Sequence, residues 1–341
     1  FNRRNGARYQ GAIEKLKKRF PYRKWRVGDG EFCGTMYHQD PVTFEIKASQ
    51  AEYARNLKTI PVNRNRMQAK TALATDREIS ALRTANGGAN WLGGQSRPDL
   101  SVQVSMSQQC FPHPTVQDLL NANTRIRRTK QHADVEIIYK YIPLQNLTIA
   151  FCSDAAFANA RNERTQAGQL LFFADARLND GQDVPVTPAA WKSYRLPRVV
   201  ASTLAGEAQA YAGASGTAEW LVLMVREALE GKFDLRTVFQ DKPRCKPVGI
   251  TDCRSLYDHV ISMSAPSVLD DRRTAIDIAI IRQSATRTGL VTRWVPTNRM
   301  VADALTKDQG GPADLLRSIL KHGKYQIADE SVVLDRQAAE G

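Results

Sequence analysis

The sequence predicts an α/β domain built on one mixed β-sheet and preceded by a mostly helical region. Before about residue 135, apolar residues recur at helical spacing. Between about residues 135 and 195, β-branched and aromatic residues gather in short runs separated by turns. After residue 200, apolar runs of strand length alternate with long helical patterns, which is typical of a sheet covered by helices.

The first region reads as a series of helices with one short strand. Residues 11–20 place apolar residues at helical spacing opposite a basic face, and residues 43–60 read as a short strand followed by a helix. The glycine pair at 87–88 is expected to end the following helix. Helices are predicted within residues 11–20, 43–60, 67–88, 91–111 and 113–130.

The second region begins with a β-rich run at 135–143 and then predicts a mixed five-stranded sheet with flanking helices. Its first three strands follow one another directly, whereas the last two alternate with helices. The strands are predicted within residues 147–154, 168–178, 186–195, 247–252 and 290–296. The helices are predicted within residues 202–231, 253–263, 269–289, 299–307 and 312–323.

The charge of the chain is unevenly distributed. The net charge is +13, and residues 1–146 hold 24 Lys and Arg against 12 Asp and Glu, while the rest is nearly balanced. A one-sided basic surface predicts a polyanionic partner such as nucleic acid, although a basic face that only aids solubility has the same composition.

Membrane and secretory signals are missing from the sequence. No apolar run approaches the ~18 residues of a membrane helix, and no signal-peptide pattern opens the chain. The five cysteines are odd in number and widely spaced, which favours neither a disulfide framework nor a zinc site. We therefore expect an intracellular protein, of cytoplasm or nucleus, with reduced thiols and no membrane partner.

Four acidic residues stand near the ends of predicted elements. Asp154 and Asp252 end strands, Glu207 lies in the first turns of a helix, and Asp303 follows the last strand. Each alone has an ordinary explanation, such as a helix cap for Asp252. Ligands of open α/β sheets gather at strand ends, and clustered carboxylates need cations to relieve their repulsion. Together the four acids predict a site for two Mg²⁺ ions, with Mn²⁺ as a substitute, about 3.5–4 Å apart.

The motifs around these acids occur in the order known from one family. The stretch FCSDAAFANARNERTQAG contains Asp154, WKSYRLPRVVASTLAGEAQAYA contains Glu207, and PVGITDCRSLYD contains Asp252. The stretch WVPTNRMVADALTK ends in the pattern Ala-Asp-x-Leu-Thr-Lys around Asp303, and SRPDLSVQVSMSQQCFPHPT lies upstream. In these motifs the chain resembles the polymerase–ribonuclease H region of copia-type LTR retrotransposon polyproteins.

The resemblance implies an organisation for the whole chain. Residues 1–62 resemble a reverse transcriptase remnant that follows the polymerase active site (palm- or thumb-like), and residues 63–145 a helical connection-like region. Residues 146–328 are expected to form a ribonuclease H-like domain, followed by a tail at 329–341. The paired-Asp polymerase motif is not in the sequence, so we expect a fragment without polymerase activity whose partners include the rest of the polyprotein.

The activity that the resemblance implies is hydrolysis of the RNA strand of RNA–DNA hybrids by a two-metal mechanism. Asp154, Glu207, Asp252 and Asp303 are then the catalytic and metal-binding residues. Phosphate contacts are expected from a basic stripe in the first region and from arginines near the acids. The predicted nucleic-acid-binding residues are Arg125, Arg127, Arg128, Lys130, Arg164, Arg195 and Arg198. For the first four, a charge cluster that suits a helix C-terminus is the alternative.

The chain departs from the family pattern at two positions, and the second departure predicts slower turnover with a retained metal site. The family usually carries Lys-His-Ile-Asp before the last strand, whereas Ala275 replaces the His here and Asp277 is kept. Retroviral relatives place a mobile His after a Val-Pro pair, where this chain has Asn298. Two alternatives stay open: a nucleic-acid-binding remnant whose chemistry has lapsed, and an integrase-like strand-transfer enzyme, against which the long spacings of the acids argue.

Overall fold

The structure, a computed structural model, is of the α/β class and contains two β-sheets. It describes residues 7–327, apart from gaps at 232–233, 235, 239, 241–244, 263–268, 270 and 309–310 and the side chains of residues 7–9. The predicted tail at 329–341 lies outside the described residues. None of the described helices is both long enough and apolar enough to cross a bilayer, and all five cysteines are free thiols.

The first region combines helices with a small antiparallel sheet. Its helices are α1 (Ala7–Arg19), α2 (Ala51–Asn56), α3 (Arg64–Gln68), α4 (Asp76–Gln95), the 3₁₀ helix η1 (Pro98–Leu100), α5 (Ser101–Gln108) and α6 (Val116–Gln131). Its strands β1 (Asp29–Phe32), β2 (Thr35–Gln39), β3 (Ile46–Ser49) and β4 (Ile137–Tyr139) pair in that order. The prediction of a mostly helical region therefore missed β1 and β2, because these short strands are polar and largely exposed.

Helix α4 does not end where its glycines predicted. Its first turn begins at Thr75, whose backbone N–H donates to the Glu78 carboxylate at 2.8 Å, and it continues past the pair at 87–88 to Gln95. Gly88 serves close packing, because an added Cβ there would lie only 3.1 Å from Leu57 Cδ2. From sequence alone, a glycine that makes room for a neighbouring side chain cannot be told apart from a glycine that ends a helix.

The second region is built on a six-stranded mixed sheet with the order β10-β7-β6-β5-β8-β9. The strands are β5 (Leu147–Ala160), β6 (Arg164–Asp175), β7 (Val184–Arg195), β8 (Val248–Thr251), β9 (Val291–Trp294) and β10 (Lys324–Tyr325). Strands β5, β6 and β7 are antiparallel, whereas β5, β8 and β9 run parallel. The mixed sheet is confirmed, but it has six strands instead of the five predicted, because β10 is too short to leave a strand pattern.

Strand β5 is longer than predicted. The sequence suggested an end at Asp154, but β5 continues to Ala160 and forms a long hairpin with β6. Asp154 lies inside the strand and pairs with Gly168 across the ladder. The run of alanine and polar residues after Asp154 was mistaken for the start of a turn.

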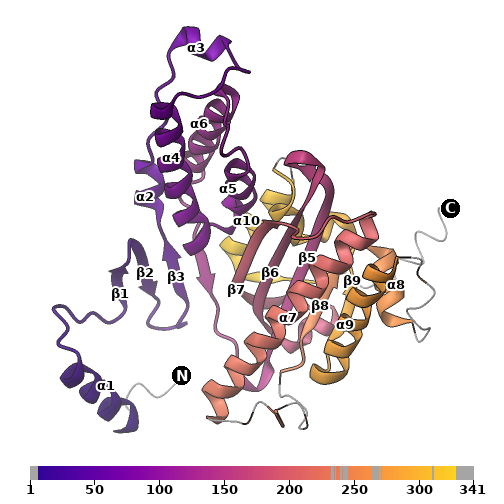
Figure 1. Cartoon of the computed structure of the whole chain (residues 1–341). Helices are drawn as coiled ribbons and strands as arrows, with labels where there is room; N and C mark the ends of the chain where they lie inside the picture. Colours follow the sequence, from indigo (N-terminus) through magenta and orange to yellow (C-terminus); the bar gives the residue numbers. More distant parts are fainter. Residues whose placement is uncertain are drawn as a thin grey trace.

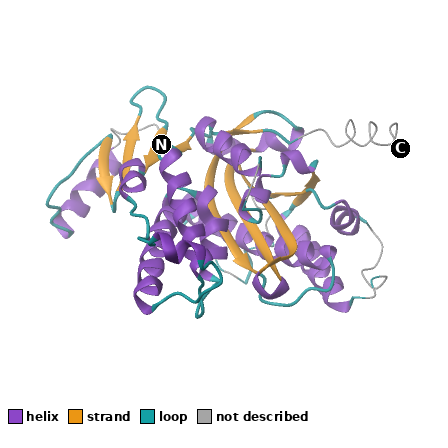
Figure 2. Ribbon diagram, turned by 90° about the horizontal axis from the view of Figure 1, so that it is seen from above, coloured by secondary structure: helices purple, strands orange, loops and turns teal. Residues whose placement is uncertain are grey.

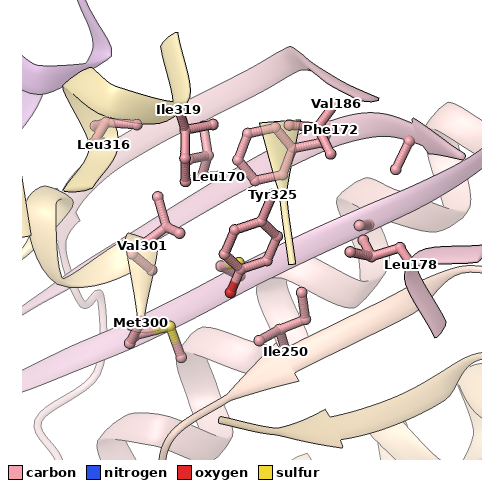
Figure 3. Packing of buried hydrophobic residues seen from close by; sticks show 14 of the residues in the cluster. Leu170, Phe172, Leu178, Val186, Ile250, Met300, Val301, Leu316, Ile319 and Tyr325 are labelled. Atoms are coloured by element: carbon pink, nitrogen blue, oxygen red, sulfur yellow. The ribbon is translucent and has the colours of Figure 1, made fainter. Parts of the chain in front are cut away.

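Helices cover both faces of this sheet (Figures 1 and 2). The helices of this region are α7 (Thr203–Glu230), α8 (Arg254–Ile261), α9 (Arg272–Thr288) and α10 (Pro312–His322), with the 3₁₀ helices η2 (Leu144–Asn146), η3 (Arg161–Glu163), η4 (Ala176–Asp180), η6 (Thr297–Arg299) and η7 (Val301–Leu305). Helices α7, α8 and α9 pack on Ile149 and Phe151, while α10 and η7 pack on Ala150 and Cys152. Figure 3 shows the second of these cores, in which Met300 and Val301 anchor the segment that leads to Asp303.

Candidate metal centre

Three of the four predicted acids converge on one site. Asp154 comes from the middle of β5, Glu207 from the first turns of α7, and Asp252 directly follows β8. Each offers one carboxylate oxygen, and the three oxygens lie within 4.8 Å of one another. Asp154 is 4% exposed and Glu207 is 7% exposed, whereas Asp252 is partly buried.

The pairing of β5 with β8 brings the two aspartates together. The two strands run parallel, and the last pair in their register joins Cys152 to Ile250. Asp154 and Asp252 each follow this pair by two residues, so the ladder delivers them to adjacent positions. Their meeting is a consequence of the sheet register.

Helix α7 is held so that Glu207 reaches the aspartates. Ser202 caps the helix as the sequence predicted, accepting a hydrogen bond from Ala205 N at 3.2 Å. One turn after Glu207, Tyr211 packs over Gly249 of β8, where an added Cβ would lie 1.9 Å from the Tyr211 hydroxyl. That hydroxyl is 2.8 Å from Thr292 Oγ1. The close approach at Gly249 fixes α7 on the sheet, and Glu207 Oε1 accepts a hydrogen bond from the backbone N–H of Ala155 at 3.2 Å.

Asp303 lies beside this three-carboxylate group. It is 2% exposed and sits in η7. This segment lies directly against β6 because residue 168 is glycine: an added Cβ would be 2.5 Å from Leu305 Cβ. Thr306, just after η7, donates a hydrogen bond to Asp154 Oδ2, and Lys307 Nζ donates to Asp303 Oδ2 at 2.6 Å. Asp303 is therefore a neighbour of the three-carboxylate group, and its own carboxylate is already paired with the Lys307 ammonium.

Burial and mutual repulsion shift the proton equilibria of the acids. Burial raises the pKa of Glu207 well above its ordinary value, and the charge of Asp154 adds to the effect. The same two causes raise the pKa of Asp252. They also raise the pKa of Asp303 to about 7, although the hydrogen bond from Lys307 opposes them. These carboxylates are held where their charged forms are unfavourable without a compensating cation.

The chemistry of the donors fits a hard divalent cation. Glu207 Oε2 and Asp303 Oδ1 are buried and find no hydrogen-bond partner in the part of the chain that the structure describes. Every ligand offered by the three-carboxylate group is a carboxylate oxygen, the donor that Mg²⁺ and Mn²⁺ prefer. A cation among Asp154, Glu207 and Asp252 would relieve their repulsion and satisfy the orphaned Glu207 oxygen.

The predicted basic stripe on α6 is only partly exposed. Arg127, Arg128 and Lys130 are exposed, but Arg125 is 5% exposed. The Arg125 guanidinium donates to the carbonyl oxygen of Gln103 at 3.2 Å, and burial lowers its pKa to about 10. The prediction that Arg125 binds phosphate is therefore wrong for this structure, because the side chain joins α6 to α5 instead.

The three arginines predicted near the acids have different surroundings. Arg195 is exposed at the end of β7. Arg164 donates to the carbonyl oxygens of Leu196 and Pro197, both at 2.8 Å, and so fixes the chain after β7. Arg198 forms an ion pair with Asp277 of α9 at 2.6 Å and keeps part of its side chain exposed. Arg195 is thus the most available of the three, whereas the other two already hold the fold together.

Some residues that position the acids lie in the sequence motifs, but the motifs did not indicate their role. Gly168, Thr306 and Lys307 stand in the motifs, but only the structure brings them next to Asp154 and Asp303. The contact between Tyr211 and Gly249 left no local signal, because it joins residues of a helix and a later strand.

Comparison of the chain with protein-family models, curated proteins and solved structures found no significant match. The geometry of the acid cluster and the motifs of the sequence are therefore the basis on which a function is inferred below.

Proposed function

We propose that this chain is a divalent-cation-dependent nuclease with a ribonuclease H-like fold, which hydrolyses the RNA strand of RNA–DNA hybrids. The observation that carries the proposal is the convergence of three carboxylates, one of which, Glu207, has a buried oxygen without a hydrogen-bond partner among the described residues. The sheet supports the fold assignment, because without the two-residue β10 it is a mixed five-stranded sheet with helices on both faces. The choice of an RNA–DNA hybrid as substrate follows the motif resemblance.

Each acidic residue of the centre would have its own role in binding divalent cations. Bound divalent ions would activate a water molecule and stabilise charge on the leaving oxygen of the phosphodiester. Asp154 would be one ligand, and the hydroxyl of Thr306 donates a hydrogen bond to one of its oxygens. The Ala155 N–H donates to Glu207 Oε1, so Oε2 remains as the oxygen that would bind a cation. Asp252 completes the group, and Asp303 stands at its edge.

The exposed basic residues of α6 supply a surface for the phosphate backbone. Arg127, Arg128 and Lys130 point to solvent on α6. Helix α6 packs on α5, and α5 contacts η7, the segment that carries Asp303. Phosphate contacts of these basic residues give salt-sensitive binding with little sequence preference, as expected for an enzyme that acts on any hybrid.

A cleavage assay tests the proposal. The chain is incubated with Mg²⁺ and a hybrid whose RNA strand is labelled, with duplex DNA as the comparison substrate. We expect cleavage of the RNA strand alone, its loss in Asp154→Asn, and its retention in Asp183→Asn, which removes an exposed carboxylate paired with Lys324. Binding of the hybrid without cleavage in Mg²⁺ or Mn²⁺ contradicts the proposal and favours the lapsed remnant. Processing of DNA ends instead favours strand transfer.

A further inference from the structure

A lysine already occupies one side of the acid centre. Lys307 Nζ donates to Asp303 Oδ2 at 2.6 Å, and the two residues lie four apart, across η7 and the residues that follow it. The Asp303 side chain is 3% exposed, whereas that of Lys307 is 42% exposed. The ammonium therefore lies at the surface end of a buried carboxylate, between the centre and solvent.

Asp303 stands outside the group that the other three acids form. Asp154, Glu207 and Asp252 form a group in which every pair of ligand oxygens lies within 4.8 Å, and Asp303 is not a member of that group. Asp303 nevertheless feels the charge of Asp154, so the two are close enough to interact. One Asp303 oxygen is engaged by Lys307, and the other, Oδ1, is buried without a hydrogen-bond partner among the described residues.

We propose that Lys307 is a built-in counterion that holds Asp303 out of the three-carboxylate group, so that the free protein binds one divalent cation tightly and a second only where Lys307 is displaced. This inference rests on the proposed cation site and specifies its occupancy. The first ion is held by Asp154, Glu207 and Asp252. The second would need Asp303, whose Oδ2 the ammonium already engages.

Charge explains why the lysine and a second ion exclude each other. Lys307 carries one positive charge beside the place that a second ion would fill, and the two cations repel. Even with the dielectric constant of water, a unit charge about 5 Å from a divalent ion changes its affinity by more than tenfold. Removal of the lysine charge should therefore reveal the second site.

Manganese binding to the full chain tests this proposal without reference to activity. The metal-free protein is titrated with Mn²⁺ at fixed pH, and free Mn²⁺ is counted by electron paramagnetic resonance. We expect one tight ion in the unmodified chain. We expect two in Lys307→Met, with the affinity of the second site raised at least tenfold, and one in Lys307→Arg, which keeps the charge.

Two further variants sharpen the test. Lys324→Met removes a surface lysine that pairs with Asp183 at 3.2 Å, and it should leave the count at one. Adding Asp303→Asn to Lys307→Met removes the ligand of the second site and should return the count from two to one. Thermal unfolding checks that each variant folds, and Lys307→Gln replaces Lys307→Met if the latter does not.

The possible failures are distinguishable. Two equally tight ions in the unmodified chain, or one ion in both that chain and Lys307→Met, would overturn the role of Lys307 and leave the cation site intact. No Mn²⁺ bound to the unmodified chain would overturn this inference and the proposed metal centre together.

Discussion

Replacing Asp154 by Asn should make the metal-free protein more stable while it abolishes cation binding. Asn keeps the shape of the side chain and can still accept the hydrogen bond from Thr306, but it removes a negative charge from a group of three. In the absence of divalent cations that charge repels the neighbouring carboxylates, and its attraction for the partly exposed Lys307 ammonium offsets part of that repulsion. The gain in the free energy of unfolding then measures how strongly the carboxylates repel one another.

The separation of the carboxylate oxygens sets the magnitude. Two unit charges 4.8 Å apart repel by about 1 kcal/mol with the dielectric constant of water and by about 3 kcal/mol at the effective value near protein surfaces. The charge of Asp154 helps to raise the pKa of both Glu207 and Asp252, so its removal relieves repulsion with each of them. We expect a gain of about 1–3 kcal/mol, which for a chain of this size raises Tm by roughly 1–4 °C.

Thermal unfolding at pH 8, in a chelator and in Mg²⁺, provides the assay. In the chelator, Asp154→Asn should melt above the unmodified chain. In Mg²⁺ at about 1,000 times its Kd the order should reverse, because the ion stabilises only the unmodified chain, by about 4.1 kcal/mol. The control Asp183→Asn removes an exposed carboxylate and should change stability by less than about 0.5 kcal/mol in either buffer.

The pH dependence of stability provides a second test of the same variant. As the pH falls towards 5, protonation of the acids with raised pKa values removes negative charge from both proteins, so the advantage of Asp154→Asn in the chelator should shrink. A variant that melts below the unmodified chain at pH 8 without metal would refute the claim that these carboxylates repel one another at close range.

Three further predictions address the supports of the centre. Gly168→Ala should cost about 1–3 kcal/mol in chemical denaturation, because its Cβ would collide with η7, whereas Gly216→Ala, with nothing within 4 Å, should be neutral or stabilising by up to about 1 kcal/mol. The folded-state pKa of Asp303 is raised from 3.8 to about 7, so ionisation of this group lowers the stability of the folded protein as the pH rises through that range. In a chelator, the unmodified chain should therefore lose stability relative to Asp303→Asn between pH 5 and pH 8. A stability difference that stays constant over this range would contradict the raised pKa. Arg125→Ala should lower stability by about 1–3 kcal/mol by stripping buried partners. Arg127→Ala should instead weaken hybrid binding and reduce the slope of log K against log salt concentration by about 1. Equal losses of binding in both variants would show that Arg125 also contacts the phosphate backbone.

Local chemistry made several features predictable. The helix predicted within residues 202–231 matches α7, which Ser202 caps and Gly231 ends, because a cap acts on the turn next to it. The positions of Asp154 and Asp252 relative to apolar strands also pointed to one edge of the sheet. Their exact juxtaposition needed the register of β5 on β8, which pairs residues far apart in the chain.

Other features depended on tertiary contacts that a pattern does not encode. Gly88 looked like a helix stop because its partner Leu57 lies in another segment. Arg125 was hidden in a basic run, although Ala122 and Thr129 at helical spacing mark its face as the buried one. The helical spacing of Arg125 with these residues therefore already indicated in the sequence that its side chain lies on the buried face of α6.

The central place of β5 has a consequence for how the protein matures. During synthesis, β5, β6 and β7 can form their antiparallel meander early, but β8 must insert beside β5 after a long helix has been made. Until that insertion, Asp252 has no fixed position, so the three-carboxylate group is incomplete. Under the proposed function, a cation would therefore bind and stabilise the protein only late in folding, and a chain that ends before β8 would lack the site.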